Sequence, residues 1–160
     1  MPMAIFVTSQ KIYDAFYDDY NTGKAFMHSH TYSGNPLACS AANAVLDLME
    51  DGSILKKAQE NAVFFNNLLK EKFLSHKNVG EIRHIGLINA IELVNKETKE
   101  PFDGKLRTGY QIYKKALKRG VILRPLGDVI YFNPPLIIER KDLEFAADVA
   151  YECMVEVLNT

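Results

Sequence analysis

The sequence predicts an α/β fold of the α+β type over residues 51–160, in which helices cover a small sheet. From Ser53 onward, the residue patterns predict a helix, two strands, a helix, two strands and a final helix. The 160 residues are 48% hydrophobic and 24% charged, which is enough apolar material for a folded core. Residues 1–50 do not share this pattern and are predicted to belong to a different unit.

The first unit is predicted to begin with a buried strand, Met1 to Val7. An apolar strand at residue 1 indicates either an ordinary edge strand or a chain that begins inside a larger fold, and periodicity leaves both open. Residues 9–18 have the spacing of a short helix. Asn35 and Pro36 are typical of a helix start, as N-cap and first helical residue, so a second helix is expected from there to about residue 51.

The second unit is predicted to open with a helix capped by Ser53, since apolar residues recur at helical spacing as far as Phe73. Two strands and a polar loop follow it. The predicted elements are strands over 81–84 and 87–94, a loop over 95–104, a helix over 106–117 ended by Gly120, strands over 121–123 and 129–132, and a helix over 142–158.

Charge and composition argue against several classes of protein. The chain has 19 basic and 20 acidic residues, so it carries no basic footprint for nucleic acid or for an anionic membrane surface. No apolar run approaches the ~20 residues that a membrane-spanning helix needs, and no signal peptide is visible. The two cysteines, Cys39 and Cys153, are far apart, which disfavours a disulfide framework or a zinc site. We therefore expect a soluble, cytoplasmic protein.

A polar loop before the second helix is the first candidate site. It contains His28, Ser29, His30 and Thr31 ahead of the helix start. Hydroxyl groups and backbone N–H groups at a helix N-terminus suit an anionic phosphate. The alternative is a polar loop with a good cap and no ligand. A metal site is disfavoured, because no cluster of further ligands completes a histidine pair.

The second candidate is Arg124, at the end of the apolar segment that follows Gly120. A fixed arginine offers a planar fork of donors for a carboxylate. It could equally form a salt bridge within the chain. Tyr131, on the next predicted strand, could donate a hydrogen bond to a ligand, although a half-buried aromatic is the commoner role at such a position.

Three segments together resemble the C-terminal part of the class III pyridoxal-phosphate-dependent aminotransferases. They are residues 27–43 (MHSHTYSGNPLACSAAN), 86–93 (GLINAIEL) and 120–135 (GVILRPLGDVIYFNPP). The order and spacing match across essentially all 160 residues. The arrangement Arg-Pro-x-Gly-x-x-x-Tyr most resembles the members that transfer an amino group from S-adenosylmethionine to 8-amino-7-oxononanoate in biotin synthesis.

The resemblance implies roles for the candidate residues. Thr31 matches the threonine that holds the cofactor phosphate across a homodimer interface, with Ser29 and His30 lining the same loop. Arg124 matches the arginine that binds the substrate carboxylate, and Tyr131 matches a residue beside the substrate. The implied cofactor is pyridoxal 5'-phosphate, and the implied fold is that of a fold-type I transferase. On this basis residues 1–50 are the C-terminal remnant of its large domain, and residues 51–160 are its small domain.

The chain departs from the family at the catalytic lysine. In the family, the lysine that forms the Schiff base lies upstream of a strand corresponding to Met1–Val7, and no lysine here occupies that position. We therefore expect no catalytic residue and no turnover from these 160 residues alone, because transamination needs that lysine. Two alternatives stay open. One is a class III enzyme acting on ω-amino acids or ornithine, and the other is a stand-alone, non-catalytic interaction module.

Overall fold

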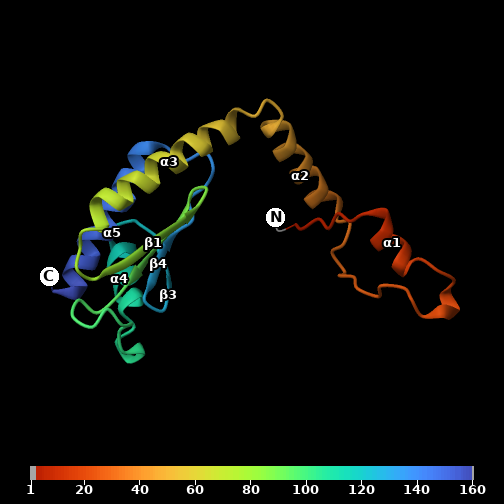
Figure 1. The fold of residues 1–160 in the computed structure, drawn as a ribbon. Helices are drawn as coiled ribbons and strands as arrows, with labels where there is room; N and C mark the ends of the chain where they lie inside the picture. The colour runs from red at the N-terminus through yellow and green to blue at the C-terminus, as the bar shows by residue number, and fades with distance from the viewer. Residues whose placement is uncertain (1–2, 160) are drawn as a thin grey trace. The chain divides into compact units, whose positions relative to one another are not determined.

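The computed structural model describes residues 3–159, drawn in Figure 1, and divides the chain into two compact units. The first unit ends at Asp51 and the second begins at Gly52. No helix among the described residues is long and apolar enough to cross a membrane.

The first unit contains two α-helices, α1 (Gln10–Phe16) and α2 (Pro36–Met49), and a short 3₁₀ helix, η1 (Tyr20–Thr22). The prediction of a strand at Met1–Val7 is wrong for residues 3–7, which form no regular structure and are exposed. Met1 and Pro2 lie outside the described residues. An apolar run becomes a strand only when a neighbouring strand accepts its backbone hydrogen bonds, and these residues pair with none of the described strands.

Helix α2 begins where the sequence predicts. The Asn35 side-chain oxygen accepts hydrogen bonds from the N–H groups of Leu37 (3.0 Å) and Ala38 (3.1 Å), and Pro36 occupies the first turn. These bonds satisfy two of the N–H groups that a helix start otherwise leaves unpaired. The polar loop before α2 is therefore tied to a firmly capped helix.

The second unit is a four-stranded antiparallel sheet with three helices packed on one face (Figure 1). The strand order is β1-β2-β4-β3. Its elements are α3 (Ser53–Phe73), β1 (Val79–Ile85), β2 (Ile88–Leu93), the 3₁₀ helix η2 (Gly104–Leu106), α4 (Thr108–Lys118), β3 (Arg124–Leu126), β4 (Val129–Phe132) and α5 (Arg140–Leu158). Burial alternates along β2 and β4, so one face of the sheet meets the helices and the other lies open.

The core lies between the helices and the covered face of the sheet. Phe65 of α3 meets Phe132 of β4 edge to face, with ring centroids 5.2 Å apart. Ile91 and Ile130 of the sheet are fully buried against them. Each such side chain contributes about 1.5–3 kcal/mol by leaving water. A buried amide pair, Asn66 and Asn89 (3.0 Å), crosses from α3 to β2 within this core.

Two sequence predictions for the second unit are wrong. Residues 121–123 form no strand; the third strand is β3, one step further along. The N–H group of Val121 donates to the carbonyl of Ala116 (3.0 Å), so this residue still belongs to the end of α4. The apolar side chains of Val121 and Leu123 are buried in the core, although their backbone does not pair with a neighbouring strand. Ser53 is the first residue of α3, and the cap position is held by Gly52 in the left-handed region (φ 71°).

Candidate functional site

Arg124 is the first residue of β3, the strand at one edge of the sheet, and its side chain lies on the open face. It pairs directly across the ladder with Tyr131 of β4. The guanidinium carbon lies 5.9 Å from the centroid of the tyrosine ring, within the range of a cation–π contact. Pro125 is tolerated in β3 because an edge strand does not need every N–H group. The structure thus brings the two predicted substrate residues together.

The guanidinium of Arg124 forms no ion pair with any described carboxylate of the second unit. Two other arginines of that unit do form ion pairs. Arg83 pairs with Glu81 and Glu92 on the sheet, and Arg119 with two glutamates of α5. Within the second unit, the salt-bridge alternative for Arg124 therefore does not hold. Its five N–H donors remain available to a carboxylate ligand.

A shallow hollow of about 390 Å³ surrounds Arg124 and Tyr131. Its lining residues come from α4, from β3 and β4, and from the segment before β3: Tyr113, Ile122, Leu123, Arg124, Pro125, Leu126 and Tyr131. The lining combines one cation and two tyrosines with four apolar residues, which suits a ligand with a carboxylate at the end of an aliphatic chain. Tyr113 was not among the residues predicted for the site, and no pattern in the sequence distinguishes its place in this lining.

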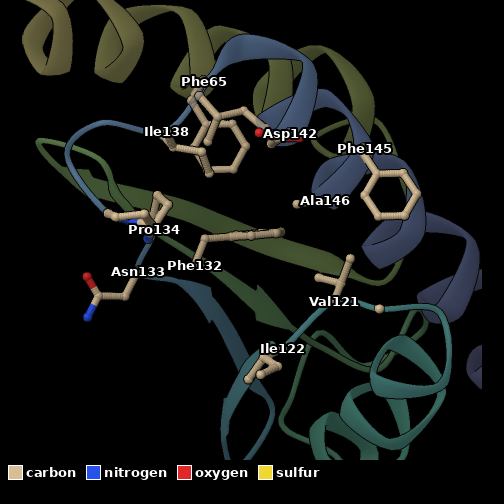
Figure 2. A pocket seen from close by; sticks show the side chains of 13 residues that line it. Phe65, Val121, Ile122, Phe132, Asn133, Pro134, Ile138, Asp142, Phe145 and Ala146 are labelled. Carbon is tan, nitrogen blue, oxygen red and sulfur yellow. The ribbon is translucent and has the colours of Figure 1, made fainter.

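A second hollow, of about 430 Å³, is lined by residues of α3, α5 and β4 and by the segment that follows α4. Figure 2 shows the side chains of Phe65 and Phe132 pointing toward each other at its wall, while the Asn133 side chain points away. Its only charged lining residue is Asp142, near the start of α5. A carboxylate ligand would find no cation there, so this hollow is not the site that the sequence predicts.

The phosphate-site candidates lie in the first unit, in the turn just before α2. The N–H group of His30 donates to the Ser33 hydroxyl (3.2 Å), and the N–H group of Ser33 donates to the carbonyl of His30 (2.9 Å). Ser29 and Thr31 are exposed. No hydrogen bond within the described residues engages either of their hydroxyl groups. Free hydroxyl donors and an imidazole on one short turn fit the oxygens of a phosphate.

The histidine rings of this turn contact each other. The centroids of His28 and His30 are 5.4 Å apart, edge to face. Residues 3–159 contain no group of three or more histidine, cysteine or acidic side chains that could hold a metal ion. The two histidines thus remain an isolated pair in the part of the chain that is described.

Cys153 is not placed as a nucleophile. Cys153 is fully buried in the core on α5. Burial raises the pKa of its thiol, partly offset by the neighbouring Arg119. A buried thiol with a raised pKa carries little thiolate and is inert. Cys39 lies in α2 and forms no disulfide.

Comparison with known proteins identifies the family to which these segments correspond. The model of the family described as aminotransferase class-III matches residues 1–154. An adenosylmethionine-8-amino-7-oxononanoate aminotransferase from Geobacter sulfurreducens is 42% identical over 92% of this chain and 33% of its own. The enzyme of the same name from Methanocaldococcus jannaschii is 39% identical over 98% of this chain and 34% of its own. A probable gamma-aminobutyrate transaminase from Oryza sativa is 34% identical over 90% of this chain and 28% of its own.

Solved structures give the same result. The crystal structure of the Methanocaldococcus jannaschii enzyme superposes with a TM-score of 0.84 at 37% identity, covering 93% of this chain and 34% of that one. An aminotransferase from Vibrio fluvialis, in its PMP-bound form, has a TM-score of 0.77 at 29% identity, over 87% of this chain and 31% of its own. The chain spans about a third of the length of these relatives.

Proposed function

The chain belongs to the class III aminotransferases, and from this premise we propose that it is part of an enzyme of biotin biosynthesis. The proposed reaction transfers an amino group from S-adenosylmethionine to 8-amino-7-oxononanoate and yields 7,8-diaminononanoate. The observation that carries the proposal is an arginine, Arg124, that lies in a surface hollow and has no carboxylate partner among the described residues of the second unit. The acceptor of this reaction is an aliphatic keto acid, which has a carboxylate to offer such a residue. The names of the relatives at 39–42% identity support the same substrates.

In this proposal Arg124 binds and orients the carboxylate of the acceptor. Its planar fork donates two parallel hydrogen bonds, which fix both the position and the direction of the acid. The ring of Tyr131, on the neighbouring strand, lies on the same side, with its centroid 5.9 Å from the guanidinium carbon. Leu126 and Ile122, which also line the hollow, offer apolar surface for the aliphatic chain to contact.

The proposed cofactor is pyridoxal 5'-phosphate, which supplies the electron sink and nitrogen carrier of amino transfer when it is bound. Ser29, His30 and Thr31 have the chemistry to hold its phosphate, because their donors are exposed and the two hydroxyl groups are unengaged. In the family these residues serve the cofactor of a neighbouring subunit, so the proposal includes a homodimer. Residues 1–50 are then the end of the large cofactor-binding domain, and residues 51–160 are the small domain.

A second candidate is transfer of an amino group from an ω-amino acid. It is favoured by the likeness to a probable gamma-aminobutyrate transaminase. Such substrates also carry a carboxylate at the end of an aliphatic chain, so the environment of Arg124 suits them as well. The two candidates differ in the amino donor and in the length of the acceptor.

The test of the function is an amino-transfer assay on the complete polypeptide that contains these residues. The protein is loaded with pyridoxal phosphate and offered S-adenosylmethionine with 8-amino-7-oxononanoate, and 7,8-diaminononanoate is measured by mass spectrometry. We expect this product to form, and to form faster than products from γ-aminobutyrate or ornithine paired with a common keto acid. Faster transfer from either of those donors, with no diaminononanoate, would reject the first candidate in favour of the second.

A further experiment asks which part of the polypeptide holds the cofactor covalently. We propose that no lysine among these 160 residues does so. After borohydride reduction of the loaded complete polypeptide, peptide mass spectrometry should find the cofactor at one mole per subunit on a lysine outside this chain. Labelling within the chain should be scattered and substoichiometric. One lysine of the chain labelled stoichiometrically would overturn this assignment.

A further inference from the structure

The turn that follows Arg124 is in direct backbone contact with helix α4. Gly109 is the second residue of α4, and a Cβ atom at this position would lie 2.4 Å from the carbonyl oxygen of Gly127. It would also lie 3.3 Å from the Cβ atom of Pro125. A Cβ atom does not approach a backbone oxygen at 2.4 Å, so any side chain here would push the turn and the helix apart. Only glycine allows this contact.

The next residue of the turn, Asp128, is held from two other sides. Its carboxylate accepts a hydrogen bond from the N–H group of Phe102 (2.9 Å), in the loop between β2 and η2. Its carbonyl accepts a hydrogen bond from the N–H group of Leu93 (3.0 Å), at the end of β2. The Gly127-Asp128 turn is therefore anchored to α4, to the loop and to the sheet.

The placement of this turn decides the placement of Arg124. Gly127 and Asp128 are the two residues that connect β3 to β4, and Gly127 has a positive φ of 61°, which the tight turn requires. Strand β3 has only three residues and one neighbouring strand, so a displacement of the turn passes along it to Arg124. The Arg124 side chain is exposed, and the one ring contact of its guanidinium among the described residues is with Tyr131, at 5.9 Å. Its direction therefore depends on the backbone beneath it.

We propose that Gly109 and Asp128 are positioning residues for Arg124. They hold the β3–β4 turn so that the guanidinium is presented to the carboxylate of the acceptor before the acceptor arrives. This inference rests on the proposed function, since it requires Arg124 to bind that carboxylate. Pre-positioned groups bind better because their ordering cost is met during folding, and small displacements of a binding group cost large factors in rate.

The test compares the acceptor acid with its primary amide, which lacks the charge that Arg124 binds. In the complete polypeptide, Gly109→Ala should raise the KM for the acid by about tenfold and leave the KM for the amide within about twofold. Gly104→Ala is the matched control. It makes the same chemical change where no atom lies within 4 Å of the new Cβ atom, and it should change neither KM.

A second pair of variants keeps the test decisive if Gly109→Ala does not fold. Asp128→Asn retains an oxygen for the Phe102 N–H group and should keep the KM for the acid close to that of the wild type. Asp128→Ala removes that oxygen and should raise the KM for the acid. In an Arg124→Ala background, neither Gly109→Ala nor Asp128→Ala should add a further effect, because the residue that they position is gone.

The outcomes separate the positioning role from the proposed function. If Arg124→Ala changes the KM for the acid and the Gly109 and Asp128 variants do not, the positioning role is wrong and the function stands. If the variants raise the KM for acid and amide equally, their effect is a general loss of structure, and the positioning role is again wrong. If Arg124→Ala itself has no effect, the proposed function fails, and this inference fails with it.

Discussion

Replacing Arg124 by alanine is expected to raise the KM for 8-amino-7-oxononanoate by roughly 10- to 150-fold in the complete polypeptide. The change removes hydrogen bonds to a charged group, which are worth about 1.5–3 kcal/mol, and each 1.4 kcal/mol is a factor of ten. The effect should be this large because no other cation lines the hollow around Arg124. The measurement is steady-state kinetics with the acceptor varied and the donor saturating.

Two further variants show that the effect belongs to this guanidinium. Arg124→Lys keeps the positive charge and loses the planar fork, so its KM should fall between those of the wild type and Arg124→Ala. Arg119→Ala removes an arginine of the same unit whose guanidinium is already paired with Glu152 and Glu156, and it should leave the KM unchanged. If the Arg124→Ala enzyme has the KM of the wild type, Arg124 does not bind the acceptor.

Replacing Thr31 by alanine is expected to weaken binding of pyridoxal phosphate by at least about tenfold. The hydroxyl of Thr31 is exposed and has no hydrogen-bond partner among the described residues, so its loss costs the isolated chain nothing that the structure shows. The loss is felt only when the phosphate is bound, where a hydrogen bond to a charged oxygen is worth about 1.5–3 kcal/mol. The measurement is titration of the cofactor-free complete polypeptide, followed by absorbance.

The controls for Thr31 use one variant that keeps the hydroxyl and one that removes a different hydroxyl. Thr31→Ser should bind the cofactor nearly as well as the wild type. Thr22→Ala removes a hydroxyl that donates to the carbonyl of Asp19 (2.8 Å) in the same unit, and it should not change cofactor affinity. Equal affinity of Thr31→Ala and the wild type would show that the turn before α2 does not touch the phosphate.

Local patterns predicted the elements whose causes are local. The strand at residues 129–132 was predicted with its exact bounds, since a short β-branched and aromatic run lies between turn residues. The start of α2 was predicted because Asn35 and Pro36 act within one turn of helix. The long final helix was predicted to within two residues of its start from the spacing of its apolar side chains.

The two wrongly predicted strands arise where the cause is distant in the sequence. Residues 121–123 and residues 3–7 are apolar enough for strands, but a strand also needs a neighbour with matching hydrogen-bond groups. In the first case Tyr131 and its neighbours pair one step further along, with Arg124 to Leu126. In the second case no described strand lies alongside.

The sequence by itself determined the class III family, the α+β class of the second unit and the residues worth testing. Motifs and periodicity depend only on which residues follow one another along the chain, so they can be recognised without the structure. Only the tertiary structure decided that Arg124 faces Tyr131 on an open sheet face and has no acidic partner within its unit. It alone placed Gly109 against Gly127, since a close approach of two backbones depends on how a helix and a turn pack. Side-chain identity indicates which residues are candidates for a site. The strand register and the packing of distant segments decide which of these side chains lack an intramolecular partner and can bind a ligand.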